Sequence, residues 1–173
     1  YEVLEGDFTL SEAAQPGGPQ NMWLVPGSPD LAGSVVELPR LTSPNTRLRE
    51  QLGTVKDDFD FILIDCPPAL GPVTVNALAA ADRVIVPVQA EYLALEGLVQ
   101  FLDTLSTVRR EINPNLELAG VVVTMHDERT RLAQDVERDL RDHFSETVFR
   151  NVIPRTVRVA EAAQSIGTHA TCP

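Results

Sequence analysis

The sequence predicts an α/β fold in which a mostly parallel sheet is flanked by helices. Residues 61–64 form an uninterrupted apolar run, which is typical of a central strand that is covered on both faces. Between residues 91 and 110, apolar side chains recur every three or four positions, which predicts a long amphipathic helix. Strands and helices of this length alternate along the chain, and this alternation favours right-handed βαβ units.

In the first half of the chain, glycines and prolines mark the boundaries of the expected elements. The turn at residues 27–30 caps a helix, and Pro44 begins another helix whose inner face carries Leu48 and Leu52. The expected elements are a helix at 7–14, a surface loop at 15–20, a strand at 22–26, helices over 31–38 and from 44, a strand at 59–65 and a helix at 72–80.

In the second half, apolar periodicity defines the elements. Leu95, Leu98 and Leu105 belong to the spacing of the long helix, which ends before Asn113-Pro114. A second amphipathic helix is expected over residues 130–144. The expected elements are a strand at 83–88, the helix at 91–110, a strand at 116–125, the helix at 130–144, a strand at 148–153 and a helix at 157–164.

Composition indicates one domain and excludes several classes of protein. With 173 residues and 43% hydrophobic content, the chain can bury one sizeable core, so we expect a single globular domain. No apolar stretch approaches the roughly 20 residues that span a bilayer, and no signal-peptide pattern is present, so we expect a cytoplasmic protein that does not engage membranes.

The two cysteines are too few for a disulfide framework. We expect Cys66 to be a buried thiol at the end of a strand. A cysteine nucleophile would need a nearby base, and the three histidines stand in no recognisable arrangement with Cys66, so the inert interpretation is preferred. The histidines are His126, His143 and His169.

Charge is unevenly distributed along the chain. The formal net charge is −11, which argues against a constitutive nucleic-acid binder. Residues 129–173 nevertheless carry seven arginines against six acidic residues, a local charge of +1. Arg138 and Arg141 lie among acidic residues and are best explained as part of a solvated helix face.

Asp65 is the strongest candidate for chemistry. It follows the apolar run at 61–64, and in open α/β sheets ligands bind outside the carboxyl ends of the strands. A carboxylate at that edge is suited to Mg²⁺ and phosphates, although an aspartate in a turn also serves as a cap. The prolines that follow Cys66 end the strand and stiffen the loop.

A set of motifs in one order, covering about residues 1–162, resembles the ParA/Soj group of chromosome- and plasmid-partitioning ATPases, in the deviant Walker A (MinD/ParA) class. This resemblance implies a P-loop NTPase fold of the SIMIBI type, in a single partial domain over residues 1–162, followed by a tail at 163–173 that departs from the family pattern. The motifs are Asp65-Cys-Pro-Pro-Ala-Leu-Gly71, Thr74-Val-Asn-Ala-Leu78, Pro87-Val-Gln-Ala-Glu-Tyr92, Ala94-Leu-Glu-Gly-Leu98, Thr124-Met125 with Arg129-Thr130, and Val152-Ile-Pro-Arg-Thr-Val-Arg158.

The resemblance implies a role for each matching position. Asp65 corresponds to the carboxylate that holds Mg²⁺ through its water shell, and the residues after it correspond to a switch segment that senses the γ-phosphate. Two loops correspond to the adenine side of the nucleotide site, Gln89 and Glu91 lie near the nucleotide or the dimer interface, and two arginines correspond to sequence-independent DNA contacts. The switch residues are Cys66, Pro67 and Pro68; the adenine-side residues are Thr124, Met125, Pro154, Arg155 and Thr156; the DNA-binding residues are Arg129 and Arg158.

The Gly-rich, Lys-containing loop that holds nucleotide phosphates in this family has no counterpart in the chain. Lys56 is the only lysine, and neither it nor Gly17-Gly18 stands in such a loop. We therefore expect a fragment that lacks the first βαβ unit and the catalytic aspartate, contains no catalytic residue, and does not hydrolyse ATP by itself.

The resemblance thus predicts part of a partitioning protein. In its complete form this would be an ATP- and Mg²⁺-dependent homodimer, nucleoid-associated in the cytoplasm, which binds non-specific DNA and is regulated by a ParB-type protein. A MinD-like cell-division ATPase is one alternative, disfavoured because nothing after Ile166 is basic and amphipathic. A non-catalytic relative that binds a partner through the surface of the helix at 91–110 is the other alternative.

Overall fold

The computed structural model describes residues 1–158, with the side chain of Leu93 excepted, and its chain divides into two compact units. The first unit comprises residues 1–84 and 101–117, and the second comprises residues 85–100 together with the described chain from 118 onward. Three elements contribute residues to both units: strand β3 (Arg83–Gln89), helix α6 (Tyr92–Glu111) and strand β4 (Glu117–Thr124). The expected single domain over residues 1–162 stays a prediction.

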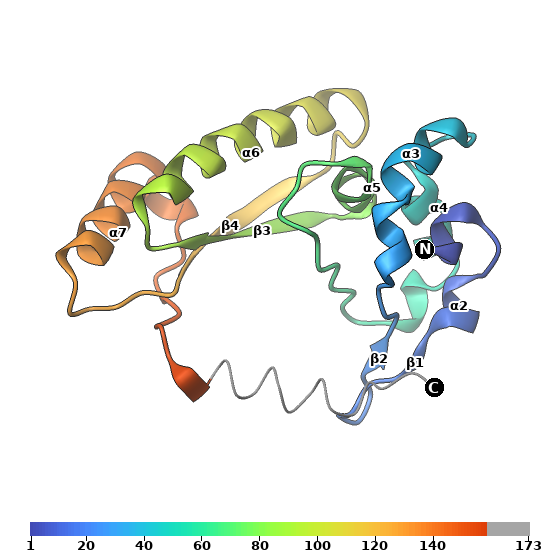
Figure 1. Ribbon diagram of the computed structural model, residues 1–173, viewed down its shortest axis with the longest axis horizontal. Helices are drawn as coiled ribbons and strands as arrows, with labels where there is room; N and C mark the ends of the chain where they lie inside the picture. The colour runs from blue at the N-terminus through green and yellow to red at the C-terminus, as the bar shows by residue number, and fades with distance from the viewer. Residues whose placement is uncertain (159–173) are drawn as a thin grey trace. The chain divides into compact units, whose positions relative to one another are not determined.

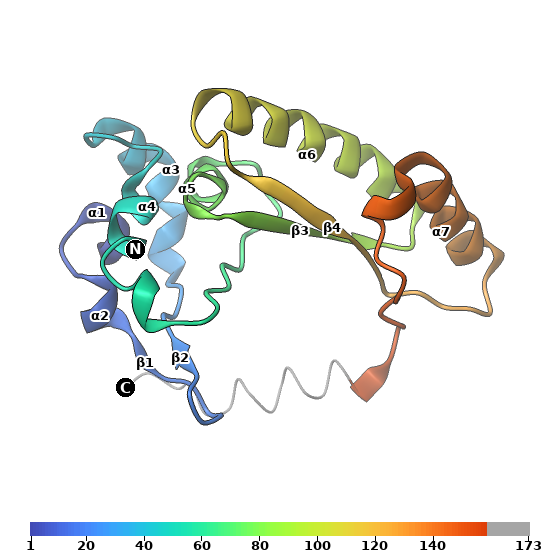
Figure 2. The same ribbon diagram turned by 180° about the vertical axis from the view of Figure 1, so that it is seen from behind.

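The first unit consists mainly of short helices (Figures 1 and 2). Thr9 and Glu12 form a capping box at the start of one of them, and Gly6, with φ of 97°, ends another in the left-handed conformation that glycine tolerates. The elements are α1 (Glu2–Glu5), α2 (Leu10–Ala13), β1 (Gln15–Pro16), β2 (Trp23–Leu24), α3 (Ser34–Glu37), α4 (Arg47–Leu52), α5 (Pro72–Ala80) and 3₁₀ turns at Pro29–Ala32, Leu38–Arg40 and Lys56–Asp58.

Helices α4 and α5 are joined by the fully buried side chain of Asn76. Its amide nitrogen donates to the carbonyl oxygens of Pro44 (2.7 Å) and Pro72 (3.0 Å), and its oxygen accepts from the Leu48 N–H (3.3 Å). Arg49 donates to the last-turn carbonyl of Ala79 at 2.7 Å, which satisfies a group that the helix itself leaves free. A satisfied polar network therefore fixes the contact between these two short helices.

The second unit contains a parallel pair of strands with helices against it. In Figures 1 and 2, β3 and β4 lie side by side. Helix α7 (Arg131–Phe144) begins at Thr130, whose side chain accepts from the Ala133 N–H, and is followed by a 3₁₀ turn at Ser145–Thr147. Buried side chains of β4 and of the apolar face of α7 form a core. It includes Val121, Val123, Val136 and Leu140.

The segment after α7 runs parallel to β4 without forming a regular strand. The N–H of Phe149 donates to Val121 O at 2.9 Å, and the N–H of Ile153 donates to Val123 O at 2.8 Å. Isolated parallel bridges join Val121 to Val148 and His126 to Pro154. The expected strand at 148–153 is therefore reduced to separate bridges with β4.

The expected central strand at 59–65 is wrong for this structure. These residues form an extended segment without strand pairing, visible in Figure 2 between the Lys56–Asp58 turn and α5. Phe61 and Leu63 are 87% and 91% exposed, so the run is not covered on both faces. The reason is that no strand within residues 1–158 pairs with this segment, so its backbone has no ladder of hydrogen bonds. Its first residue, Phe59, packs against a hydrophobic cluster formed by Val3, Leu10 and Val55.

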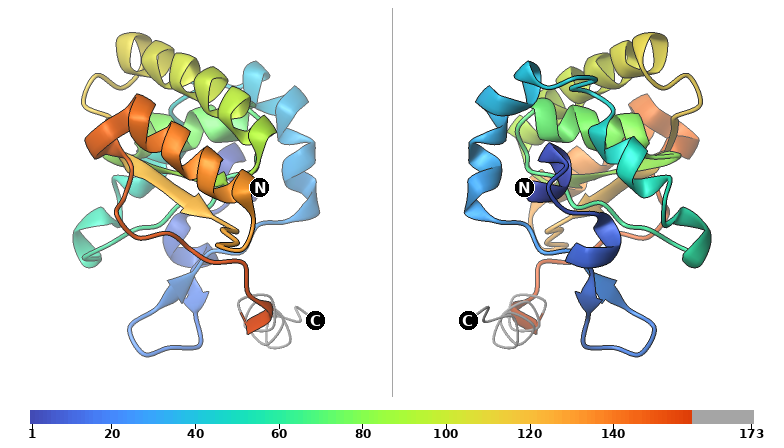
Figure 3. Two further views of the ribbon diagram at one scale, coloured as in Figure 1. Left: turned by 90° about the vertical axis from the view of Figure 1, so that its left-hand side faces the viewer. Right: turned by 90° about the vertical axis from the view of Figure 1, so that its right-hand side faces the viewer.

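Other expectations differ in extent rather than in kind. Helix α5 matches its predicted bounds, and β3, β4, α6 and α7 agree to within about a residue at each end. The predicted helix at 31–38 is divided by Gly33 into a 3₁₀ turn and α3, the helix expected from Pro44 begins at Arg47, and the helix expected at 7–14 shortens to α2. The strand expected at 22–26 shortens to β2, which pairs antiparallel with β1 in a hairpin (Figure 3).

Two further expectations concern the end of the chain and membranes. The end of the helix expected at 157–164 and the tail at 163–173 lie outside the described residues. Within residues 1–158, no helix has the length and apolar character needed to cross a bilayer.

Candidate functional site

The structure brings together two of the segments selected from the sequence, although they lie about thirty residues apart in the chain. The N–H of His126 donates to Ile153 O at 3.1 Å, and the N–H of Arg155 donates to His126 O at 2.9 Å. These two bonds place Thr124 and Met125 at the carboxyl end of β4 beside the loop of Pro154, Arg155 and Thr156. The edge formed by the carboxyl ends of parallel strands is where open α/β sheets bind ligands.

A pocket of about 380 Å³ opens at this edge of the second unit. Met125, Leu132 and Ala133 give it apolar walls, while Thr130 supplies a hydroxyl group. Three charged side chains complete the lining, so the pocket combines apolar contact surface with a few polar groups, as small-molecule sites do. Its lining residues are Ala90, Glu91, Met125, Asp127, Thr130, Leu132, Ala133 and Arg155.

The charged groups of the pocket are paired with one another and with the neighbouring loop. Arg155 Nη2 lies 3.1 Å from Glu91 Oε1, and the side chains of both residues are 54% exposed. Asp127 accepts from Nε and Nη2 of Arg129 at 2.9 and 2.8 Å. The hydrogen bonds from Arg129 hold the pKa of the Asp127 carboxyl well below its usual range, with a smaller contribution from the charge of Arg155. The carboxylate therefore stays ionised at neutral pH.

The backbone around Met125 is unusual. Met125 has φ of 53°, in the left-handed region that residues other than glycine rarely adopt. Its neighbour Thr124 accepts from the Ala90 N–H at 3.0 Å through its carbonyl oxygen and donates its hydroxyl to Val88 O at 3.4 Å. The strained turn directs the chain out of β4 into the loop that carries Asp127, which is consistent with strain being kept at functional positions.

Gln89, the last residue of β3, and Glu91, which follows the strand, differ in their relation to the pocket. Glu91 lines the pocket, as its expected location near a ligand requires. Gln89 is exposed; its carbonyl oxygen accepts the Glu91 N–H at 2.8 Å, and it is not among the residues that line the pocket.

The residues selected around Asp65 lie in the first unit, in the extended segment without strand pairing. Asp65, Cys66, Pro67 and Pro68 are all exposed, which corrects the expectation of a buried thiol. The carboxylate of Asp65 forms no ion pair in the described chain, and no group of three metal-ligating side chains occurs there. A single free carboxylate fits a Mg²⁺ ion that keeps most of its water ligands.

The thiol of Cys66 is in an environment that disfavours its reactive form. Its sulfur lies 3.8 Å from Ile64 O. Removal of water from around the sulfur raises the pKa of Cys66, and the neighbouring charge of Asp65 raises it further. A nucleophilic cysteine requires the opposite shift, so the inert interpretation of this thiol is supported.

The two arginines expected to contact DNA differ in their surroundings. The side chain of Arg129 is 88% exposed, but Asp127 binds its guanidinium group. Arg158 is exposed near the end of the described chain, where its backbone N–H donates to Thr156 Oγ1 at 3.2 Å and its side chain forms no ion pair with any residue of the described part.

Several residues of the pocket were not found from the sequence. Asp127, Thr130, Leu132 and Ala133 come from the β4–α7 loop and the first turn of α7. One usable signal was present, because an aspartate followed three positions later by a threonine before an amphipathic helix predicts a capped turn. The sequence contains no signal that predicts the pairing of Glu91 with Arg155, since 64 positions separate the two residues.

His126, also missed, is buried between β4 and α7. Its Nε2 atom lies 3.0 Å from Glu137 Oε2, but the approach angle is outside hydrogen-bond geometry, so both ring nitrogens lack a hydrogen-bond partner. Glu137 is held in turn by Arg141, which also donates to the carbonyl oxygens of Phe149 and Arg150. These contacts fix α7 against the segment that leads to the pocket loop.

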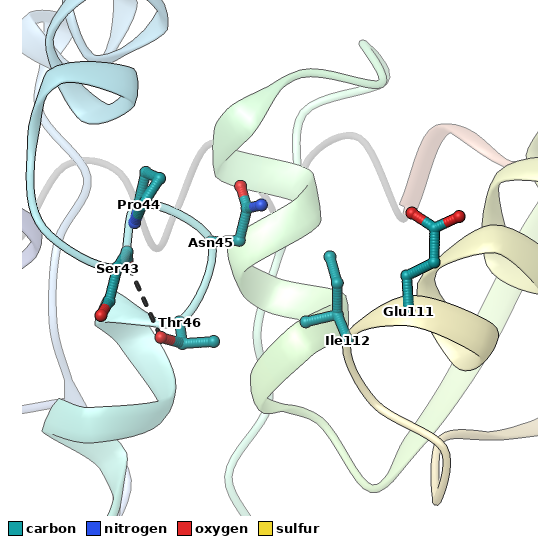
Figure 4. A pocket seen from close by; sticks show the side chains of 6 residues that line it. All are labelled: Ser43, Pro44, Asn45, Thr46, Glu111 and Ile112. Atoms are coloured by element: carbon teal, nitrogen blue, oxygen red, sulfur yellow. Dashed lines mark hydrogen bonds between the residues drawn. The ribbon is translucent and has the colours of Figure 1, made fainter.

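A second pocket, of about 350 Å³, lies in the first unit (Figure 4). Its walls come from the loop before α4 and from the end of α6. Thr46 Oγ1 is 3.5 Å from Ser43 O, and Glu111 is paired with Arg110 at 2.8 Å. It contains none of the residues selected from the sequence and offers no unpaired charge, so we assign it no function. Its lining residues are Ser43, Pro44, Asn45, Thr46, Glu111 and Ile112.

The AAA domain family matches residues 1–118 of this chain. Among curated proteins, the chromosome-partitioning ATPase Soj of Thermus thermophilus is 53% identical over 173 residues, which is 98% of this chain and 66% of that protein. The chromosome partitioning protein ParA of Myxococcus xanthus is 42% identical over 161 residues, covering 93% of this chain and 57% of that protein.

Among solved structures, cobyrinic acid a,c-diamide synthase of Mycobacterium smegmatis with bound ADP and magnesium is 42% identical, with a TM-score of 0.82. The match covers 90% of this chain and 63% of that chain. The chain thus spans about 57% to 66% of the lengths of these relatives.

Proposed function

This chain belongs to the AAA domain family, in its ParA/Soj group, and from this premise we propose that it is part of an ATP-dependent chromosome or plasmid partitioning protein. The observation that carries the proposal is the meeting of residues 124–125 with residues 154–156 at the carboxyl end of β4. These are the two segments that the family resemblance assigns to the adenine side of a nucleotide site.

On the adenine side, Met125 would offer an apolar surface to a flat base. In the 154–156 loop the Arg155 N–H is already bonded to His126 O and Pro154 has no N–H, so Thr156 N–H and the carbonyl oxygens would contact the edge of the base. The neighbouring pocket lies against the same loop, because Met125 and Arg155 belong to its walls. Binding a base between an apolar side chain and a proline-stiffened loop requires little reordering of the chain, which favours affinity.

On the phosphate side, Asp65 would hold Mg²⁺ through water, and Cys66, Pro67 and Pro68 would form the segment that senses the γ-phosphate. The carboxylate of Asp65 is exposed and forms no ion pair with any of residues 1–158, which supports this role. Magnesium supplies charge neutralisation of the phosphates. The cation and the backbone cradle that hydrolysis needs are not found in the 173 residues, so we expect no ATP turnover from these residues alone.

For DNA, Arg129 and Arg158 would contact the phosphate backbone without reading sequence. Arg129 follows the first of the two segments that meet at the carboxyl end of β4 by four positions, and Arg158 follows the second by two. With a net charge of −11, one copy would bind weakly, and a homodimer formed with ATP would double the basic surface. A ParB-type partner would regulate the switch, and the protein would be associated with the nucleoid.

The name of the Mycobacterium structure suggests a second function, the synthesis of a diamide from cobyrinic acid. Both functions share a nucleotide with magnesium, so nucleotide binding does not distinguish them. DNA binding does, because it follows from the partitioning function alone. We favour partitioning because Arg129 and Arg158 match the DNA-contacting positions of that group.

The nucleotide assignment is tested by titrating the chain with a fluorescent ATP analogue and Mg²⁺. The two methionines of the chain provide a matched pair, since Met125 and Met22 are 41% and 47% exposed. Met125→Asp places a carboxylate beside the proposed base and should weaken binding at least about tenfold, a difference of roughly 1.4 kcal/mol. Met22→Asp should bind as the wild type does. Equal affinities of the two variants, or no saturable binding by the folded wild type, would contradict the assignment.

The DNA assignment is tested with the Arg158→Glu variant. In the complete protein, where an ATP-bound homodimer can form, we expect this variant to abolish retention on non-specific duplex DNA while nucleotide affinity stays at the wild-type value. Arg150→Glu makes the same charge change at an exposed position whose side chain has no assigned role, and should reduce retention only slightly. Retention that survives in Arg158→Glu would show that Arg158 is not a DNA contact.

A further inference from the structure

Arg129 does not present a free positive charge. It follows Asp127 by two positions in the loop between β4 and α7, and it donates three hydrogen bonds to the carboxylate of Asp127. Oδ1 accepts from the backbone N–H at 3.1 Å and from Nε at 2.9 Å, and Oδ2 accepts from Nη2 at 2.8 Å. The side chain is nevertheless 88% exposed, so the pair stands at the surface.

Two other arginines, unlike Arg129, have no acidic partner among the described residues. Arg131, two positions further along, is exposed and forms no ion pair with any described residue, and the same holds for the side chain of Arg158. Phosphate binding by arginine uses the same two-pronged guanidinium edge that Asp127 occupies on Arg129. Of the two arginines assigned to DNA, Arg129 is therefore neutralised in this structure and Arg158 is not.

Asp127 also faces the pocket. It lines the same cavity as Arg155 and Glu91, and Arg155 is close enough to contribute to its electrostatic environment. Asp127 therefore lies between the loop assigned to the nucleotide and the arginine assigned to DNA. An acidic residue at this position lowers the net positive charge of the proposed DNA-binding surface by one.

We propose that Asp127 is an electrostatic restraint on DNA binding: by pairing with Arg129 it lowers the affinity of the loop for DNA phosphates, an inference that rests on the proposed DNA-binding function. Exposed ion pairs are weak, so the restraint acts mainly through charge. When DNA displaces Asp127 from Arg129, the carboxylate remains beside the phosphates and repels them.

The experiment is a salt titration of the full chain with Mg²⁺ and ATP on a short duplex of random sequence, followed by fluorescence anisotropy. Asp127→Asn removes the charge but keeps an oxygen that can accept the Arg129 N–H, so the turn is preserved. One extra neutralised phosphate steepens the slope of log affinity against log salt by about 0.9, which corresponds to roughly eightfold tighter binding at 0.1 M salt if affinities converge at 1 M.

The matched control is Glu128→Gln. It makes the same charge change one position away, at an exposed side chain that is in no ion pair of the described chain. We expect it to tighten binding less than about twofold, because a charge that contacts neither arginine acts only at long range. In an Arg129→Gln background, Asp127→Asn should increase the affinity for DNA no more than Glu128→Gln does.

The outcomes separate the inference from the function on which it rests. Tighter binding and a steeper salt slope for Asp127→Asn than for Glu128→Gln support the restraint. Equal effects of the two variants, or weaker binding by Asp127→Asn, overturn it while DNA binding by the wild type stands. Absence of DNA binding by every folded variant, the wild type included, overturns both.

Discussion

Two segments of this molecule carry the same kind of sequence signal and differ in structure. Residues 59–66 and the end of β4 are both apolar runs that lead to residues selected for chemistry. At the end of β4, Val121 and Val123 are fully buried and their carbonyl oxygens accept from Phe149 and Ile153. In the other segment, Phe61 and Leu63 are 87% and 91% exposed, and the backbone has no partner strand in the part of the chain described.

The difference shows that an apolar run specifies a strand only together with its neighbours. A strand exchanges hydrogen bonds with an adjacent strand and packs its side chains on another layer, and both come from elsewhere in the chain. For β4, β3 and the segment after α7 provide these partners. For residues 59–66 none is present in residues 1–158, and the same kind of sequence stays extended and unpaired.

The largest effect expected from this comparison is on stability. Leu140 packs in the core around β4 with no exposed surface, so Leu140→Ala should lower the free energy of unfolding by about 2–5 kcal/mol. Leu63→Ala makes the same truncation at a side chain that is 91% exposed and should change it by less than about 0.5 kcal/mol. Urea denaturation measures both. A large loss for Leu63→Ala would mean that residues 59–66 are packed in solution.

A smaller effect is expected where α7 holds the segment that leads to the pocket. Arg141 pairs with Glu137 and donates to the carbonyl oxygens of Phe149 and Arg150, so Arg141→Ala should cost about 1–2 kcal/mol of unfolding free energy. Arg138→Ala removes only an exposed pair with Asp135 and should cost less than about 0.5 kcal/mol. If the two losses are equal, the carbonyl contacts of Arg141 do not contribute.

Substitution of the residue that caps the start of α7 should have a smaller effect on stability. Thr130 accepts from the Ala133 N–H at 3.3 Å, so Thr130→Ala should destabilise the chain by about 1 kcal/mol. Thr107 is the comparison within α6, where its hydroxyl donates back to the Asp103 carbonyl, and Thr107→Ala should be neutral or slightly stabilising. Thermal unfolding followed by circular dichroism distinguishes the two variants. If Thr130→Ala has no effect on stability, the Thr130 cap does not stabilise α7.

The smallest effect concerns reactivity in the unpaired segment. Because the pKa of Cys66 is raised by loss of water and by the neighbouring Asp65, the thiolate form is populated only at higher pH than in an unfolded chain. Alkylation of the peptide containing Cys66, followed by mass spectrometry, should therefore reach its half-maximal rate at a higher pH in the native chain than in urea. A midpoint that is lower in the native chain would indicate an activated thiol.

The elements that could be predicted from sequence are those whose own pattern is long. Helices α6 and α7 repeat their apolar positions over several turns, and Thr130 marks where α7 begins. Elements of two to four residues, such as α1 and β1, have no period to recognise. The strand at 59–65 was wrong for another reason, because its existence depends on partner strands that its own residues cannot reveal.

The same limit applies to the site. Met125 and Arg155 were identified through a family resemblance, and the structure adds that they line one pocket. Glu91 was placed near a ligand, but its ion pair with Arg155 arises from the fold. Asp127 was missed because its importance lies in a contact with Arg129, and no motif in the sequence shows that the arginine is already neutralised.

The most direct test is a map of backbone amide chemical shifts of the ¹⁵N-labelled chain during titration with Mg²⁺ and ATP. The assignment of the adenine side to the carboxyl end of β4 predicts that the largest changes fall at residues 124–127 and 153–156, where the two segments are paired. It also predicts that residues 43–46 and 111–112, around the other pocket, do not respond. Largest changes at that second pocket, or no saturable change anywhere in the folded chain, would contradict the account.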